Sequence, residues 1–348
     1  MQYAAPMLPT RPASDPTLLY RLRDSLYAAD LLTAALVELD FFTRLQEIVP
    51  ADLDQLCQSL ELAPRPTDVA VTLFAALGLI AREGPALALT RTARDHLVRS
   101  SPFFLGPYYA SFRSRPLVRS FADVLRSGRP ASWAASSTQQ DWATAMLEPA
   151  FAAQFTGAMD SRGLYLGPAL ADAVDLEERR ALLDVAGGSG IYACCLADRF
   201  PNLRATVLER PPVDRVAADS IAARGFSTRV TVHAADMLAD SWPDGYDVHL
   251  FSNVLHDWDV PLVSRLLERS AAALPAGGLV IVHDAHLNAE KTGPLAVAEY
   301  SALLMHSTEG RCYGVSEMEQ LLVKAGFEHV KMTPTAADRS VVTAVKRK

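Results

Sequence analysis

From Arg180 onward, short apolar runs alternate with amphipathic spacers, and this alternation constrains the fold more than any other feature of the chain. The runs are "ALLDVAGG", "RATVLE", "RVTVHAAD", "YDVHLFSNV" and "GGLVIVHDA". Short apolar strands with helices between them are typical of a parallel sheet covered on both faces. We therefore expect an α/β fold with a doubly wound, Rossmann-like sheet over residues 176–348, in which ligands bind where the strands end.

The first part of the chain follows a helical pattern instead. Asp15 followed by Pro16 predicts a helix start, and the adjacent Leu18 and Leu19 are followed by Leu22, Leu26 and Leu31 at spacings of three to five residues. The stretch "DVAVTLFAALGLIAREGPALALT", from Asp68, predicts a helix, a glycine stop and two short strands, which is the order of a winged helix. We expect a helical, winged-helix-containing domain over residues 1–100 and a helical linker that lines a substrate pocket over 101–175.

Composition limits the possible partners. The formal net charge is −7, and acids outnumber arginines in the first hundred residues, which contain no lysine. Phosphate binding needs clustered basic residues, so we expect no nucleic-acid partner. No apolar run approaches the roughly 18 residues that span a bilayer, and the first residues lack the pattern of a secretory signal. The four cysteines have no metal-finger spacing. The sequence predicts a cytoplasmic protein without a membrane partner.

The strand ends carry the residues of a nucleoside pocket. After the first strand, "DVAGGSGIYA" supplies glycines and then a helix start, a combination that lets a backbone approach a ligand closely. Gly188, Gly190 and Ala193 also fit a dinucleotide fingerprint, so this loop by itself leaves NAD open. Glu209 follows the second strand, where a carboxylate can accept both ribose hydroxyls. After the third strand, Asp236 and Met237 pair an acid with an apolar side chain.

Together the motifs "LLDVAGGSG", "VLERP", "ADML", "NVLHDWD", "ALPAGG" and "LLVKAGF" resemble those of S-adenosylmethionine-dependent methyltransferases of the plant caffeate and bacterial antibiotic O-methyltransferase type. The resemblance covers the whole chain and implies that the N-terminal part forms a homodimer. It implies that Gly187, Gly188 and Gly190 wrap the methionine part of the cofactor and that Glu209 holds the ribose. It further implies that Asp236 and Met237 flank the adenine.

The segment after the fourth strand carries the expected chemistry. The resemblance implies that Trp258 covers the cofactor and that His256 is the general base that removes a proton from the acceptor. A histidine whose pKa lies near neutrality suits that task. Ser252 stands where the family has a lysine, which puts one cofactor contact in doubt, and Ala186 stands where the family has a glycine.

The carboxylates that orient the histidine are incomplete. Asp284, after the fifth strand, matches the first of the family's two carboxylates, but the second position holds Cys312. His283, His286 and His306 add imidazoles to the same region. Two histidines and an aspartate suit a divalent zinc or iron ion, and the resemblance extends to metal-dependent 2-oxo-acid C-methyltransferases with ligands at His256, Asp284 and His306.

Several functions therefore stay open. The histidine pattern favours metal-assisted C-methylation at the β-carbon of a 2-oxo acid, where the metal would acidify the neighbouring CH. The alternative is metal-free O-methylation of a phenol or enol, with His256 as base and Asp284 orienting it. Outside the methyltransferases, the candidates are an NAD-dependent oxidoreductase and a non-catalytic regulatory protein that keeps the fold. We expect a small-molecule methyltransferase of secondary metabolism, such as antibiotic biosynthesis.

Overall fold

The computed structural model describes residues 8–131 and 142–348, and the chain divides into two compact units. The sheet unit is formed by Met1–Thr17, Ala134–Ala285 and Glu317–Lys348. The helical unit is formed by Leu18–Trp133 and His286–Ser316. The three-part division at residues 100 and 175 expected from the sequence stays a prediction.

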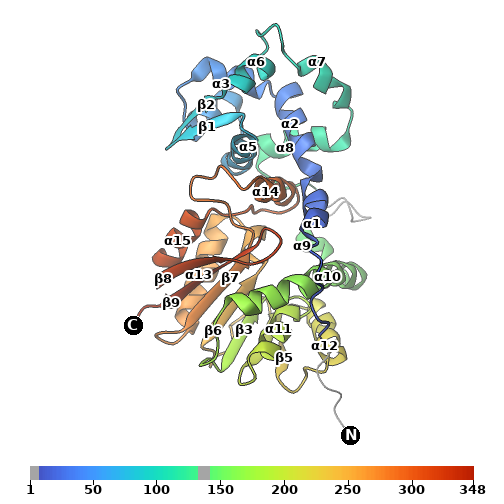
Figure 1. Cartoon of the computed structure of the whole chain (residues 1–348), viewed down its shortest axis with the longest axis vertical. Coiled ribbons are helices and arrows are strands. Elements are labelled where there is room, and N and C mark those ends of the chain that lie inside the picture. The colour runs from blue at the N-terminus through green and yellow to red at the C-terminus, as the bar shows by residue number, and fades with distance from the viewer. Residues whose placement is uncertain (1–7, 132–141) are drawn as a thin grey trace. The chain divides into compact units, whose positions relative to one another are not determined.

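The helical unit contains a two-stranded sheet among its helices (Figure 1). Its elements are α1 (Thr17–Asp24), η1 (Ser25–Tyr27), α2 (Ala28–Val37), α3 (Phe41–Ile48), α4 (Leu53–Leu60), α5 (Pro64–Ala76), β1 (Ile80–Glu83), β2 (Ala86–Leu89), α6 (Arg91–Leu97), α7 (Gly106–Tyr109), η2 (Ala110–Phe112), α8 (Pro116–Ser127) and α14 (Leu295–Ser307). Within 8–131 and 142–348, no helix of the chain is long and apolar enough to cross a membrane.

The wing expected after Asp68 is present. Helix α5 ends at Ala76, Gly78 turns the chain with a φ of 70°, and β1 and β2 then pair antiparallel. The first helix begins at Thr17, and the Asp15 carboxylate accepts a hydrogen bond from the Thr17 amide at 2.9 Å. The predicted helix start is thus confirmed, one residue later than Pro16.

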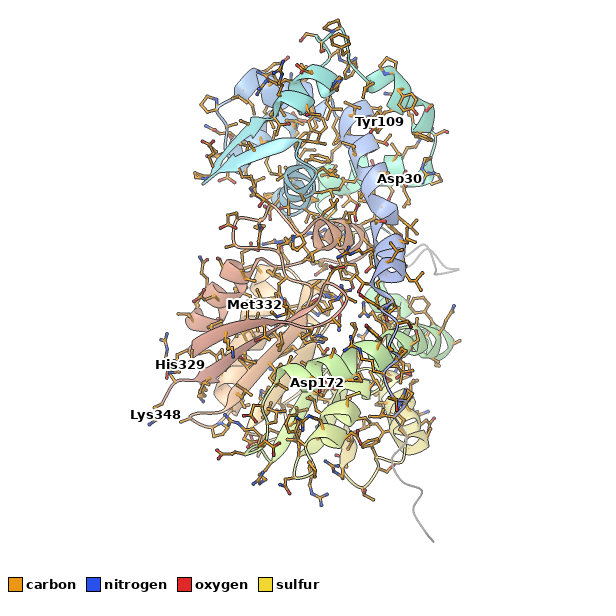
Figure 2. The ribbon with its side chains drawn as sticks, viewed as in Figure 1. Asp30, Tyr109, Asp172, His329, Met332 and Lys348 are labelled. Carbon is orange, nitrogen blue, oxygen red and sulfur yellow. The ribbon has the colours of Figure 1, made fainter. Side chains whose placement is uncertain are left out.

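Aromatic rings and buried ion pairs hold the helical unit together. Phe41, Phe42 and Phe74 are fully buried, with ring centroids 5.1 to 5.4 Å apart. Asp30, labelled on α2 in Figure 2, is 2 % exposed and accepts two hydrogen bonds from Arg115, at 2.5 and 2.8 Å. This bidentate pair joins α2 to the start of α8, and such fork-to-carboxylate contacts are among the stronger hydrogen-bonded pairs.

A second ion cluster in the helical unit surrounds Asp68 on α5. Its carboxylate binds Lys291 and lies 3.4 Å from the Arg82 guanidinium and 3.7 Å from that of Arg311. Burial opposes the charge on Asp68, but these basic groups outweigh burial and hold the pKa of its carboxyl below its ordinary value. The cluster ties α5 and the wing to the segment around α14.

Most of the leucines at the start of the helical unit lie on its surface. Leu18, Leu19, Leu22 and Leu26 are between 58 and 68 % exposed, whereas Leu31 on α2 is fully buried. The first four leucines therefore lie outside the core. They form an apolar face on α1 and η1 that the chain's own core does not cover.

The sheet unit holds the predicted doubly wound sheet, and its elements are β3 (Ala181–Val185), β4 (Arg204–Glu209), β5 (Val230–Ala234), β6 (Val248–Ser252), β7 (Leu279–Asp284), β8 (Phe327–Pro334) and β9 (Ser340–Lys346), with α9 (Trp142–Ala145), α10 (Pro149–Ala173), α11 (Ile191–Arg199), α12 (Val213–Ala223), η3 (Leu255–Asp257), α13 (Val260–Ala273) and α15 (Val315–Lys324). Figure 1 shows α11 and α12 beside β3 to β5, and α13 and α15 beside β7 to β9.

The strand order is β5-β4-β3-β6-β7-β9-β8. All five strands predicted from the sequence are confirmed, and they pair parallel to one another. A hairpin of β8 and β9, which the sequence pattern did not indicate, extends the sheet: β9 pairs antiparallel with β7 and with β8. Strand order reverses at β3 and β6, so the loops after these two strands flank the switch point where such sheets bind ligands.

Candidate active site

The loop after β3 has the backbone of a ligand cradle. Ala186, Gly188 and Gly190 have φ values of 54°, 59° and 74°, in the left-handed region that glycine adopts without strain. A Cβ on Gly187 would lie 2.5 Å from the Asp184 carboxyl, so this position also requires glycine. Ala186 shows that the loop keeps the left-handed conformation even where the family's glycine is replaced.

Two buried carboxylates face this loop. Glu209 accepts hydrogen bonds from the Gly188 and Arg210 amides, both at 3.0 Å. Asp184 is fully buried, and neither of its carboxyl oxygens makes a hydrogen bond with the described residues. Burial, together with the Glu209 charge, raises the pKa of Asp184 to about 8. Burial raises the pKa of Glu209 to about 7, partly offset by its amide hydrogen bonds. A pair of desolvated acids suits a ligand with a cationic group and hydroxyls.

Helix α10 is tied to the same loop by Asp160. Its carboxylate accepts a hydrogen bond from the Ser189 hydroxyl at 2.5 Å and two from Arg224 at 2.5 and 2.7 Å. Arg224 follows α12, so one carboxylate joins α10, the glycine loop and α12. Neither Asp160 nor Asp184 was predicted as a site residue from the sequence. A carboxylate at the end of an apolar strand was the available signal for Asp184, whereas nothing in the α10 pattern marks Asp160.

Asp236 and Met237 lie directly after β5. The Asp236 carboxylate accepts a hydrogen bond from the Leu238 amide at 2.7 Å, which fixes the turn. Met237 is 9 % exposed, and its carbonyl accepts a hydrogen bond from the Trp242 indole at 3.0 Å. The structure thus places an acid and an apolar side chain at the third strand end, as expected, with the backbone held by local bonds.

The end of β6 carries a buried polar network. The Ser252 hydroxyl lies 2.9 Å from Nδ1 of His283, and Nε2 of His283 lies 3.3 Å from the Thr335 hydroxyl. Asn253 has a φ of 54° and donates a hydrogen bond to the Tyr192 hydroxyl at 3.1 Å. His283 is fully buried and bound at both ring nitrogens, so its role is to join β6 and β7 to the loop before β9.

His256 and Asp284 meet where β6 and β7 end. The last residue of β7 is Asp284, whose Oδ1 lies 2.5 Å from His256 Nδ1 and also accepts a hydrogen bond from the Ala285 amide. A carboxylate only accepts, so Nδ1 carries the proton and the lone pair of the neutral ring is on Nε2. Burial favours the neutral imidazole, but the Asp284 and Asp257 charges outweigh it and raise the pKa of His256.

A second acid lies beside the same imidazole. Asp257 is the last residue of η3, and its Oδ1 is 3.6 Å from His256 Nε2. Burial raises the pKa of Asp257 to about 6, although His256 and Arg162 pull it down. Trp258, half-buried, follows at the end of η3. Asp257 had no predicted role, because the spacing of residues within a single turn does not show which way a side chain points.

The predicted metal site is not supported. His306 lies on α14 in the helical unit, where its Nε2 is 2.8 Å from the Ser120 hydroxyl and its ring packs against Tyr27 and Phe121. Over the described ranges, no three His, Cys, Asp or Glu side chains form a group that could hold a metal ion. His306 is a buried residue of the helical core, and burial lowers its pKa to about 4.

Two further residues from the sequence analysis are buried in the helical unit. The backbone amide of Cys312 donates a hydrogen bond to the Ser301 hydroxyl at 3.1 Å, and the Cys312 side chain is fully buried. His286 is 7 % exposed. Neither contributes to the group formed by His256, Asp284 and Asp257, all three of which belong to the sheet unit.

Comparison with known proteins points to one family. A model described as an O-methyltransferase domain matches residues 118–328. The chain is 31 % identical, over 95 % of each protein, to a 3-hydroxy-5-methyl-1-naphthoate 3-O-methyltransferase of Streptomyces sahachiroi. It matches an O-methyltransferase family 2 protein of Planctomyces limnophilus, solved with apigenin, with a TM-score of 0.87, 33 % identity and 97 % coverage of both chains. It also matches human N-acetylserotonin methyltransferase, solved with S-adenosylmethionine, with a TM-score of 0.61, 24 % identity and coverage of 97 % and 99 %.

Proposed function

The chain belongs to the O-methyltransferase family and is an S-adenosylmethionine-dependent methyltransferase, and on that premise we propose that it methylates a hydroxyl group of a small phenolic or enolic metabolite. The observation that carries the proposal is the His256–Asp284 pair at the carboxyl ends of β6 and β7. In the sheet these strands lie next to β3 and β4, which carry the buried carboxyl groups beside the glycine loop. The naphthoate acceptor of the Streptomyces relative and the apigenin of the Planctomyces structure support an aromatic acceptor.

The residues of the cradle fit the cofactor. Asp184 is a buried carboxylate without a hydrogen bond to the described residues, which suits the ammonium group of the methionine part. Gly187, Gly188 and Gly190 would let the backbone follow that part closely, and Glu209 would accept the ribose hydroxyls. The remaining assignments are that Asp236 and Met237 hold the adenine, that Trp258 covers the cofactor, and that Ser252 acts through its hydrogen bonds to His283 and Asn253. When bound, S-adenosylmethionine supplies an electrophilic methyl group.

His256 and Asp284 would remove the proton of the acceptor hydroxyl. His256 Nε2 would take the hydroxyl proton, and the electron pair of the broken O–H bond stays on the acceptor oxygen. Asp284 keeps the imidazole in the tautomer whose lone pair is on Nε2 and stabilises the cation that forms. Holding the acceptor oxygen against the cofactor is the other contribution, because positioning alone removes a large share of such a barrier.

Metal-assisted C-methylation, which the histidine pattern favoured, is not supported. The Streptomyces sahachiroi and Planctomyces limnophilus relatives, which span the chain, are O-methyltransferases, and the side chain that was to complete the ligand set, His306, is bound to Ser120. The alternative that the sequence left open, O-methylation with His256 as base, is the function supported best. Relatives in antibiotic biosynthesis, such as the mitomycin 6-O-methyltransferase of Streptomyces lavendulae, favour a role in secondary metabolism.

A homodimer belongs to the same proposal. The apolar face of α1 and η1, at least 58 % exposed at each of its four leucines, supports a second copy of the chain as its cover. Exposed apolar faces of this kind are uncommon on monomers. We expect sedimentation or light scattering to show a dimer, and the double substitution Leu19→Asp and Leu22→Asp to yield a folded monomer. If the wild type is a monomer, the proposal of a homodimer is wrong, whereas the proposed methyltransferase activity is unaffected.

The function is tested by binding and product mass. Calorimetry should show binding of S-adenosylmethionine and none of NAD. Incubation with phenols, naphthols, flavones and 2-oxo acids, followed by mass spectrometry, should find a mass gain of one methyl group on hydroxylated aromatics. His256→Ala should abolish that gain while S-adenosylmethionine still binds. Methylation of 2-oxo acids alone, or undiminished transfer by His256→Ala, would reject the proposal.

A further inference from the structure

The cysteine at position 312 leaves the site one carboxylate short of the pattern that the sequence resembles, yet the structure brings a second acid to the base. Asp284 Oδ1 is 2.5 Å from Nδ1 of His256, and Asp257 Oδ1 is 3.6 Å from Nε2. The imidazole therefore has a carboxylate at each nitrogen. The side chains of His256 and Asp284 are buried, at 4 % and 6 % exposure, and that of Asp257 is partly buried, at 17 %.

The two carboxylates differ in what they can do. At 2.5 Å, Asp284 is hydrogen-bonded to the ring in its neutral form, since Nδ1 carries the proton. At 3.6 Å, Asp257 is beyond hydrogen-bond distance, and Nε2 of the neutral ring has no proton to donate. Asp257 therefore interacts strongly with His256 only after Nε2 has gained a proton and the ring is a cation.

That difference matters for catalysis. An interaction that is stronger once charge has formed lowers the barrier, whereas one that is equal before and after does not. The charged groups that face His256 are Asp284 from β7, Asp257 from η3 and Arg162 from α10, whose positive charge opposes the other two. With burial also disfavouring the cation, a single carboxylate leaves the protonated ring less stable than two do.

We propose that Asp257 is the second carboxylate of this site, a positioning residue that takes the place of the acid absent at Cys312 by stabilising the imidazolium of His256. The inference deepens the proposed function and rests on it. As the acceptor O–H bond breaks, its electron pair stays on the oxygen and the proton forms the Nε2–H bond. The ring then lies as a cation between the Asp284 and Asp257 anions, and the proton leaves Nε2 to water in the next step.

The electrostatic part is tested without any acceptor. Protein with ¹⁵N-labelled histidine is titrated, and the ring nitrogens of His256 are followed by NMR in the wild type, Asp257→Asn, Asp257→Glu and Asp259→Asn. Asp259 lies two residues on and caps α13 through the Val260 amide, so its amide variant is a matched control. We expect Asp257→Asn to lower the His256 pKa by about one unit. Asp257→Glu should restore it, and Asp259→Asn should leave it unchanged. An unchanged pKa in folded Asp257→Asn overturns the proposal.

The catalytic part is read from pH profiles of methyl transfer. Because the base must be neutral, the acidic limb of kcat should move to lower pH in Asp257→Asn by the same shift that NMR records. The plateau value of kcat should fall about tenfold, which is the factor that one pKa unit represents. The affinity for S-adenosylmethionine should stay unchanged. A profile identical to the wild type overturns the role of Asp257. If no hydroxylated acceptor is methylated, the proposed function fails, whereas the NMR titration still decides whether Asp257 stabilises the imidazolium.

Discussion

Replacing Asp184 by asparagine should make the free protein more stable and its cofactor binding weaker. The carboxyl is fully buried beside Glu209, and the pKa of about 8 means that the folded protein holds a proton there that the unfolded chain releases near pH 3.8. One pKa unit corresponds to about 1.4 kcal/mol, so keeping this proton at pH 7 costs about 4 kcal/mol of folding free energy. Asparagine has nearly the same shape and does not ionise.

The direction of the pH dependence of stability follows from the raised pKa of Asp184. Stability from a carboxyl whose folded pKa lies above its unfolded value is fully present below about pH 4 and is lost as pH rises to about 8. The asparagine amide is itself buried, so we expect it to recover only part of the cost, about 2 kcal/mol at pH 8. That corresponds to a rise in Tm of roughly 4 to 8 °C. Below pH 4 the gain should vanish.

The assay is thermal and urea unfolding from pH 4 to 9, with calorimetry of S-adenosylmethionine binding at pH 7. The variant should bind at least tenfold more weakly, because the Asp184 carboxyl can lose its proton when a cationic ligand binds beside it, whereas an amide cannot become an anion. Asp247→Asn is the matched control in the same sheet: its carboxylate accepts a hydrogen bond from the Ala181 amide at 2.9 Å, so this variant should be less stable than the wild type. If Asp184→Asn has the wild-type pH dependence, or is less stable at pH 8, the reasoning is refuted.

Three further outcomes follow from the same contacts. Gly190→Ala should lower stability by about 1 to 3 kcal/mol in urea titrations, because the residue has a φ of 74° and a Cβ would lie 2.9 Å from Ile221 Cδ1; an unchanged midpoint would contradict this. His306→Ala should lower the free energy of unfolding by about 2 to 4 kcal/mol through lost ring packing and the lost Ser120 hydrogen bond. EDTA should not reduce methyl transfer by the wild type, and a loss of activity on chelation would support the metal hypothesis. Asp68→Asn should cost about 3 to 5 kcal/mol at pH 7 because it leaves buried basic groups uncompensated. Its pKa is lowered, so this contribution is present above about pH 4 and should disappear as unfolding is measured at lower pH.

Sequence reasoning predicted those parts of the fold that depend on local pattern. The strands β3, β6 and β7 are almost wholly buried, and a run that is apolar on both faces has few alternatives to a central parallel strand. The hairpin of β8 and β9 was missed because β8 is largely exposed and its alternation is interrupted by a register shift between Glu328 and Lys331. The exposure of the α1 leucines could not be predicted from the sequence, because helical spacing shows that a face is apolar but not what covers it.

The candidate site divides in the same way. The sequence by itself determined that a glycine loop, Glu209, His256 and Asp284 meet at one edge, since the carboxyl ends of parallel strands share that edge. Only the tertiary structure decided how the side chains are used: Ser120, 186 positions from His306, binds that imidazole. It also placed Asp257 Oδ1 3.6 Å from Nε2 of His256. The physical reason for this difference is that the apolar pattern and the order of the strands determine the course of the backbone. Burial, hydrogen-bond partners and charge depend instead on side chains that folding brings together from distant parts of the chain.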